Sequence, residues 1–149
     1  METENIHEKF MRQALLEAEK ALKNGEVPIG AVIVSNNRII ARGYNQTEQL
    51  NDVTAHAEII AITSATNFLG SKYLKNCSLY VTIEPCVMCA GAIAWAQIPN
   101  LIFGAFDSKK GFYLFNKAIL NSKVNIINGI LKNECSKIIK DFFEKKRKN

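Results

Sequence analysis

The chain has 149 residues, of which 48% are hydrophobic and 22% are charged. These values are close to globular averages and exclude wholesale disorder, and no stretch approaches the ~18 uninterrupted apolar residues of a membrane helix. The length predicts a single domain over residues 1–149. The polar, acidic start METENIHEKF is unlike a signal peptide, so we expect a cytoplasmic protein. In that setting, four cysteines favour metal binding or catalysis over disulfides.

The net charge of +5 is unevenly placed. Residues 137–148 contain six cations against only Asp141 and Glu144. An excess of positive charge at one end suits a phosphate-rich partner. The alternative is a solvated helix end, where cations also complement the helix dipole.

Hydrophobic spacing predicts helices and strands along the whole chain. Asn36 and Asn37 suit the left-handed turn of a hairpin, and Asp52 and Thr54 are candidate helix caps. The expected elements are a helix from about Phe10 to Gly25, strands over 30–35 and 38–43, a helix over about 55–67, a strand over 78–83, a helix that Pro85 opens, strands over 100–106 and 123–128, and a final helix over 133–146. This order predicts the α/β class, as a three-layer α/β/α sandwich around a mixed five-stranded sheet.

Two cysteines follow a proline in the stretch TIEPCVMCAGAIAWA (82–96). If Pro85 opens a helix, Cys86 and Cys89 lie one turn apart on the same face. Their sulfurs then lie among unpaired backbone N–H groups at the positive end of the helix dipole, which favours thiolates. Such a pair is half of a tetrahedral zinc site or a redox dithiol.

His56 favours the zinc site, because it begins the other predicted helix, just after the expected cap. Two helices that leave neighbouring strand ends can bring His56, Cys86 and Cys89 together. Three protein ligands leave zinc a fourth position for water, which is the mark of a catalytic site. A structural site would need a fourth protein ligand, for which the candidates are His7, Cys77, Cys135 and Glu58.

Glu58 lies two residues beyond His56, about 200° around an ideal helix. The two side chains cannot both be ligands without distortion. Near the start of the helix, however, the carboxylate can reach past the metal towards the water, where a general acid/base belongs. Two thiolates cancel the charge of zinc, so the metal alone acidifies its water weakly and a carboxylate that takes the proton is needed.

The stretches HAE (56–58) and PCVMC (85–89) together match the H-x-E…P-C-x-x-C pattern of the zinc-dependent nucleobase deaminases. Longer segments, from GEVPIGAVIV to DFFEKKRK, resemble the bacterial tRNA-specific adenosine deaminases from about Phe10 to Arg147. The resemblance implies a cytidine deaminase-like fold, one Zn²⁺ per subunit and a homodimer. It also implies hydrolytic conversion of the wobble adenosine of a tRNA anticodon stem-loop to inosine.

The resemblance also assigns roles to residues. His56, Cys86 and Cys89 would bind zinc. Glu58 would move protons. The implied substrate contacts are the side chain of Asn45, the backbone carbonyl of Glu84 and the side chain of Asp107.

The chain departs from the family at the RNA-contacting rim. Val53 stands where proline is frequent, and Phe106 replaces a commonly basic residue. We expect an interleaving of rings and cations here to stack on single-stranded bases, through Phe106, Phe112, Tyr113 and Phe115 beside Asp107 and Lys109–Lys110. The alternative is that Phe112 and Phe115 fill the core or a dimer interface.

Other functions share parts of this pattern. A small-molecule deaminase acting on guanine, cytosine or a related base would have the same metal site. A thiol oxidoreductase would use Cys86 and Cys89 directly, and a catalytically silent RNA-binding module would use the zinc as structure. Four remaining side chains are expected in the core, namely Cys77, Cys135, Trp95 and Met88.

Overall fold

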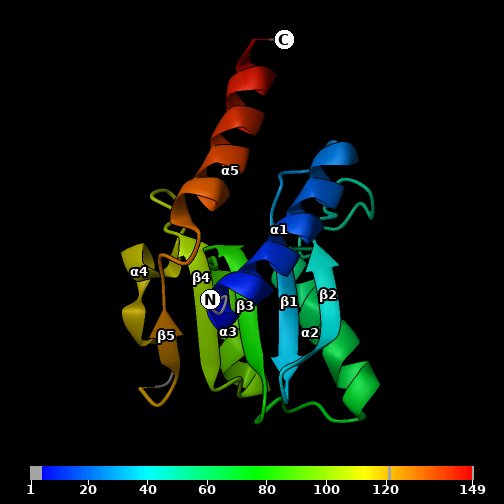
Figure 1. The fold of residues 1–149 in the computed structure, drawn as a ribbon, viewed down its shortest axis with the longest axis vertical. Coiled ribbons are helices and arrows are strands. Elements are labelled where there is room, and N and C mark those ends of the chain that lie inside the picture. The colour runs from blue at the N-terminus through cyan, green and yellow to red at the C-terminus, as the bar shows by residue number, and fades with distance from the viewer. Residues whose placement is uncertain (1–4, 121, 149) are drawn as a thin grey trace, which may run out of the picture.

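The computed structural model describes residues 5–120 and 122–148 and shows one mixed five-stranded sheet with helices on both faces (Figure 1). The strand order is β2-β1-β3-β4-β5, which confirms the predicted three layers. The elements are α1 (Ile6–Lys23), β1 (Gly30–Ser35), β2 (Arg38–Tyr44), α2 (Ala57–Leu69), β3 (Ser78–Ile83), α3 (Val87–Ala96), β4 (Asn100–Ala105), α4 (Phe112–Phe115), the 3₁₀ helix η1 (Lys117–Ile119), β5 (Asn125–Ile127) and α5 (Lys132–Arg147).

The sheet is antiparallel at one side and parallel at the other. Strand β1 pairs antiparallel with β2 and with β3, whereas β3, β4 and β5 are parallel. The hairpin turn between β1 and β2 uses Asn36 and Asn37 at φ 50° and 59°, as predicted. A parallel pair needs a crossover connection, and α3 supplies it between β3 and β4. The ends of β3 and β4 therefore meet at the same edge of the sheet.

The three central strands are buried on both faces, which explains their nearly continuous apolar sequences. Alternate side chains form two cores. One core, including Ile33, Leu79 and Phe103, packs under α2 and α3. The other, including Val32 and Tyr80, packs under α1 and α5. Figure 1 shows these two helix layers in front of and behind the sheet.

Of the four side chains expected in the core, two are exposed and two are buried. Trp95 is 83% exposed and Met88 is also exposed, because both lie on the outer side of α3. Helical spacing alone did not distinguish a face that packs on the sheet from one that points away. Cys77 and Cys135 are buried, as predicted.

The helical ends differ from the expected ones by a few residues. Helix α1 begins at Ile6 rather than near Phe10, and Asn5 caps it by accepting a hydrogen bond from the His7 amide at 2.8 Å. The short helices α4 and η1 were not predicted. The last turns of α5 extend beyond the sheet (Figure 1). None of the helices within the described residues is both long and apolar enough to cross a membrane; residues 1–4 of the polar N-terminal stretch lie outside them.

Candidate metal centre

The N-terminus of α2 positions His56. A loop of residues 45–55, called here the 45–55 loop, connects β2 to this helix. The expected cap is wrong: His56 itself is the N-cap residue, with no side-chain capping bond. Asp52 instead accepts hydrogen bonds from the amide and hydroxyl of Thr54, at 2.8 and 2.7 Å. Gly43 lets the helix approach β2 closely, since a Cβ there would lie 2.4 Å from the Ala57 carbonyl oxygen.

The N-terminus of α3 positions the two cysteines. Pro85 was expected to open this helix, but the helix begins at Val87 and Cys86 is the N-cap residue. Glu84 and Pro85 belong to neither β3 nor α3, so the helix begins two residues after the proline. Cys86 and Cys89 still lie one helical turn apart, and the Cys86 carbonyl accepts a hydrogen bond from the Ala90 amide at 2.8 Å.

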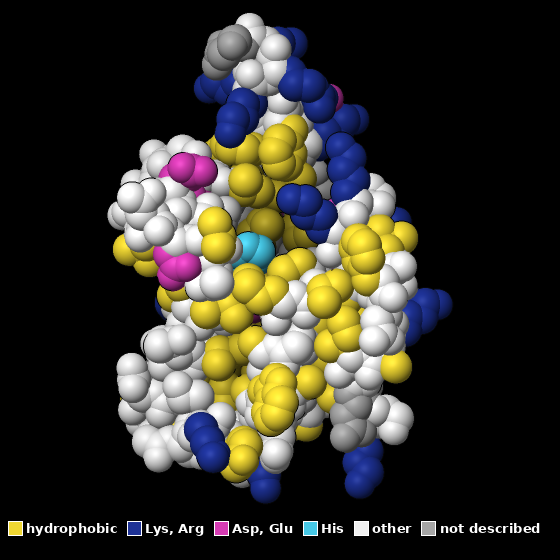
Figure 2. All heavy atoms as spheres, turned by 180° about the vertical axis from the view of Figure 1, so that it is seen from behind, with side chains coloured by type: hydrophobic (Ala, Val, Ile, Leu, Met, Phe, Trp, Pro, Cys, Tyr) yellow, Lys and Arg dark blue, Asp and Glu magenta, His cyan; other side chains and the backbone are white. Residues whose placement is uncertain are grey.

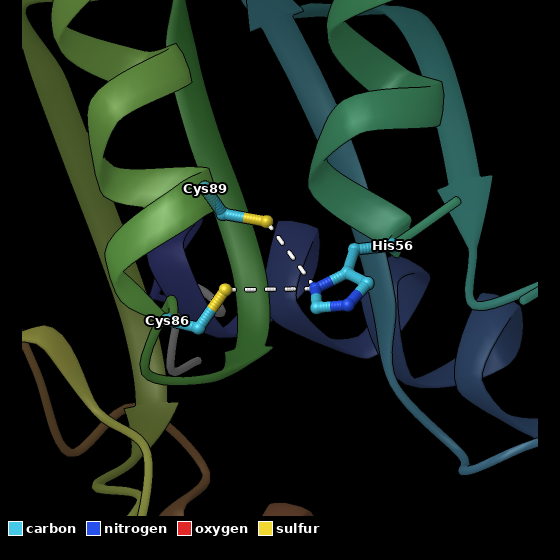
Figure 3. Close-up of side chains that lie close together, drawn as sticks. All are labelled: His56, Cys86 and Cys89. Carbon is cyan, nitrogen blue, oxygen red and sulfur yellow. Dashed lines mark hydrogen bonds between the residues drawn. The ribbon is translucent and has the colours of Figure 1, made fainter. Parts of the chain in front are cut away.

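The structure brings His56, Cys86 and Cys89 together, with one ligand atom from each within 4.8 Å of the others. Figure 3 shows the three side chains pointing toward one another from two helix ends. His56 Nδ1 lies 3.6 Å from Cys86 Sγ and 3.5 Å from Cys89 Sγ. A tetrahedral zinc with bonds of about 2.3 Å to sulfur and 2.0–2.1 Å to nitrogen separates these atoms by about 3.6 Å. The three donors therefore fit one zinc ion.

The charge balance of the cluster also suits a cation. Hydrogen bonds with Cys89 and His56 lower the pKa of the Cys86 thiol to about 4. The hydrogen bond with Cys86 is the main cause that raises the pKa of the Cys89 thiol, and burial is the second. The hydrogen bond with Cys86 raises the pKa of His56, while burial and, less strongly, the nearby Lys110 ammonium oppose that rise. The two cysteines thus hold one negative charge readily. For both to be thiolates, a cation must lie between the two sulfurs.

Glu58 lies in the first turn of α2 and is buried. Burial raises the pKa of its carboxyl group to about 7, and a hydrogen bond from its own backbone amide, the charge of His56 and a hydrogen bond with Cys89 oppose the rise. The carboxylate is not one of the three clustered ligand groups. It lies against one of them, where it can exchange a proton with a molecule bound at the cluster.

The predicted substrate contacts lie on two loops. Asn45 begins the 45–55 loop and is buried; its amide group donates to the Val27 carbonyl at 3.3 Å and accepts from the Thr47 amide at 3.4 Å. One amide hydrogen and one lone pair remain for a ligand. Asp107 lies on residues 106–113, called here the 106–113 loop, where it accepts from the Lys109 and Lys110 amides at 3.0 Å.

Glu84 directly follows β3, and an isolated bridge between Cys86 and Gly111 joins this turn to the 106–113 loop. Its carboxylate is buried and accepts hydrogen bonds from the Asp107 and Tyr113 amides at 3.0 and 2.9 Å. The resemblance assigned a role only to the backbone carbonyl of this residue.

Glu26 was not predicted at all. It lies between α1 and β1, is 1% exposed, and accepts hydrogen bonds from the Glu48 and Gln49 amides at 3.1 and 2.7 Å. The only signal in the sequence was a glutamate next to the otherwise apolar stretch VPIGAVIV. An acidic side chain beside such a stretch is either exposed or buried with hydrogen-bond donors around it. The sequence does not identify those donors.

The aromatic residues of the rim divide into buried and exposed rings. Phe112 is fully buried in the core, so the core alternative is confirmed for this ring. Phe106 is 51% exposed and lies edge-on to buried Phe103, with ring centroids 5.1 Å apart. Tyr113 lies 5.6 Å from Phe106, and the Lys117 ammonium lies 5.5 Å from the Tyr113 ring centre. Phe115 is exposed.

Comparisons with known proteins agree with this geometry. The family model described as MafB19-like deaminase matches residues 5–147. The tRNA-specific adenosine deaminase of Aquifex aeolicus is 43% identical over 147 residues, which cover 95% of this chain and 97% of that protein. The tRNA-specific adenosine deaminase of Agrobacterium fabrum is 45% identical over 143 residues, with coverage of 93% and 94%.

Solved structures give the same result. A structure from studies of A-to-I editing by tRNA:A34 deaminases at the wobble position of transfer RNA has a TM-score of 0.81 and 43% identity. It covers 87% of this chain and 98% of its own. The guanine deaminase of Bacillus subtilis also has 43% identity, with a TM-score of 0.64, but it covers only 67% of this chain and 64% of its own. The chain therefore belongs to the MafB19-like deaminase family, among the tRNA-specific adenosine deaminases.

Proposed function

We propose that this protein converts the wobble adenosine of a tRNA anticodon loop to inosine by hydrolytic deamination. The observation that carries the proposal is the meeting of His56, Cys86 and Cys89 at two helix N-termini, in a chain similar to tRNA-specific adenosine deaminases over 93–95% of its length. We place the protein in the cytoplasm with its tRNA substrate, as one deaminase domain over residues 1–149.

The cluster of His56, Cys86 and Cys89 would hold one zinc ion per subunit. Bound there, zinc would supply Lewis-acid activation of a water molecule. Glu58 takes the proton of the attacking water with its carboxylate and delivers protons to N1 of the adenine and to the departing amine. Its buried position beside Cys89 supports this role, because bulk water is kept away from the proton that it carries.

The two loops and the residue that follows β3 supply the substrate contacts in this proposal. Asn45 would hold the flipped-out nucleoside with the hydrogen-bonding groups that its partners in the protein leave free. The backbone carbonyl of Glu84 would accept a hydrogen bond from the leaving amine. Asp107 would contact the RNA at the edge of the site, next to the cations Lys109 and Lys110.

The main alternative is a small-molecule base deaminase, which the likeness to guanine deaminase favours. The likeness to the tRNA enzymes extends over more of the chain, including the basic C-terminal helix α5. A free base has no phosphate to bind these cations, so the C-terminal charge favours the RNA substrate.

We also propose that the protein is a homodimer that associates through α2 and α3. Large apolar side chains are exposed on these helices, namely Phe68, Leu69, Val87, Met88 and Trp95. Figure 2 shows hydrophobic side chains spread over this side of the molecule. Several large apolar side chains exposed on neighbouring helices of a small protein mark an interface, and a second copy of the chain is the partner that we propose.

The test is a substrate panel for the zinc-loaded protein. An arginine-tRNA anticodon stem-loop, free adenosine, guanine and cytosine are each incubated with the enzyme, and the products are measured by mass spectrometry. We expect inosine at the wobble position of the stem-loop and no turnover of the free bases. Deamination of guanine with an unchanged stem-loop would overturn the proposal in favour of the small-molecule alternative.

A further inference from the structure

The first observation concerns the 45–55 loop, which leads from β2 directly to His56. The Glu26 carboxylate, 1% exposed, accepts one hydrogen bond with each oxygen, from the amides of Glu48 and Gln49. These donors lie 22 and 23 residues away in sequence. The carboxylate therefore fixes the position of a loop whose backbone pairs with no strand of the sheet.

A second buried carboxylate, that of Glu84, holds the 106–113 loop in the same way. Glu84 lies two residues before Cys86, and its carboxylate accepts one hydrogen bond with each oxygen, from the amides of Asp107 and Tyr113. Gly111 packs against the carboxylate so closely that a Cβ at this position would lie 2.1 Å from Glu84 Oε1. The Phe112 amide also donates to the Pro85 carbonyl at 3.0 Å.

Burying these two carboxylates costs so much desolvation free energy that packing alone does not explain them. A buried carboxylate is stable only when donors replace its hydration, and here the donors are backbone amides of loops rather than cationic side chains. In both glutamates, hydrogen bonds from loop amides replace the lost hydration, and these bonds hold the loop in one position. Each loop carries a predicted substrate contact, Asn45 on one and Asp107 on the other.

We infer that Glu26 and Glu84 are positioning residues that hold the 45–55 and 106–113 loops at the distance and orientation that an RNA loop requires. The inference rests on the proposed function. Neither carboxylate touches the reacting atoms. They act through the backbone of the two loops, so they control how tightly RNA binds more than how fast the bound base reacts.

The test compares Glu26→Gln and Glu84→Gln with Glu17→Gln. Glutamine keeps the shape of the side chain but turns one acceptor oxygen into an NH₂ donor that faces a backbone N–H. Glu17 is the matched control because it is equally buried, but its carboxylate binds Lys20 and Arg42 on the opposite side of the sheet, at 2.9 and 3.3 Å. Zinc content and melting temperature are recorded for all three variants.

The first readout is amide hydrogen exchange, which needs no substrate. Glu26→Gln is expected to speed exchange at Glu48 and Gln49 by about 10- to 100-fold, because one amide loses its acceptor and the other is left with a neutral one. Glu84→Gln is expected to do the same at Asp107 and Tyr113. Glu17→Gln leaves all four amides unchanged.

The second readout is the division of the effect between KM and kcat on the anticodon stem-loop. We expect both loop variants to raise KM about tenfold or more, with a smaller fall in kcat, while Glu17→Gln changes neither by more than about twofold. If the loop variants match Glu17→Gln in KM, the inference is wrong even though the wild type deaminates the RNA. A wild type that leaves the RNA unchanged overturns the proposed function instead, and the exchange data still show whether the carboxylates hold the loops.

Gly111→Ala is a second route to the Glu84 loop, in case Glu84→Gln does not fold. The added methyl group would push the Glu84 carboxylate away from the loop, and because Gly111 also pairs with Cys86, zinc content is measured alongside. We expect it to reproduce the rise in KM and the faster exchange at Asp107 and Tyr113. Unchanged exchange and KM in this variant would contradict the inference.

Discussion

The metal centre and the loops around it are held together by different kinds of contact. In the centre, His56, Cys86 and Cys89 face one another as side chains from two helix N-termini. In the loops, the buried carboxylates of Glu26 and Glu84 bind backbone amides. In our proposals, the metal centre carries out the reaction and the two loops determine how tightly RNA binds. Mutations should therefore separate loss of chemistry from loss of RNA binding.

The largest effect is expected at Glu58. Glu58→Ala should keep about one zinc per chain and lower turnover of the stem-loop by about 10³-fold or more, because the carboxylate moves protons without holding the metal. Metal analysis and single-turnover rates measure the two properties.

His56→Ala is the matched variant within the same helix end. It should lose zinc together with activity, and it should melt at a lower temperature because metal binding is linked to folding. If Glu58→Ala purified without zinc, glutamate would be a ligand and the division of roles would be wrong.

The same contrast explains what the sequence allowed us to predict. The centre could be predicted because ligand chemistry is carried by rare side chains at local spacings, as in HAE and PCVMC. The central strands could be predicted because burial on both faces needs continuous apolar sequence. Glu26 could not, because its partners are amides 22 and 23 residues away and backbone amides have no sequence pattern. Trp95 was misplaced for a related reason, because an exposed apolar side chain and a buried one look alike in sequence.

A smaller effect is expected at the exposed face of α3, which belongs to neither region. Trp95→Glu should weaken self-association roughly 30- to 1,000-fold, because a large ring at the centre of an interface contributes much of its energy. Sedimentation velocity over a concentration series measures the change.

Leu16→Glu is the matched control, an exposed leucine on α1 on the other side of the sheet. It should associate like the wild type. A wild-type protein that stays monomeric at all concentrations would contradict the proposed dimer.

The next effect concerns two rings of the rim, half-exposed Phe106 and partly buried Tyr113. Phe106→Ala and Tyr113→Ala should each weaken stem-loop binding about 5- to 150-fold, because stacking on one base is worth roughly 1–3 kcal/mol. Zinc content and turnover of saturating RNA should change little, since the rings lie outside the ligand cluster. Fluorescence anisotropy measures the affinity.

Tyr73→Ala is the control for a ring near cations. Its ring lies 5.1 Å from the Lys72 ammonium and 5.6 Å from that of Lys75, in the segment before β3, at the opposite end of that strand from Glu84. Its loss should leave RNA binding unchanged. Equal affinities for all three variants would show that Phe106 and Tyr113 serve only to pack against neighbouring side chains such as Phe103 and Phe112.

The smallest effect is expected at the end of α5, which carries charge but no predicted contact with the base. Lys145, Lys146, Arg147 and Lys148 follow the last acidic residue, Glu144, and the dark blue side chains around this helix are plain in Figure 2. Changing these four residues to glutamine keeps the helix length and removes only charge. The slope of log affinity against log salt should flatten by about 0.7–0.9 for each phosphate that the variant no longer neutralises, with a few-fold loss of affinity at low salt.

The double variant Lys72→Gln with Lys75→Gln is the control and should keep the wild-type slope. Coinciding slopes for the wild type and the α5 variant would mean that this charge only stabilises the helix end, where cations complement the dipole, and a small-molecule substrate would regain support.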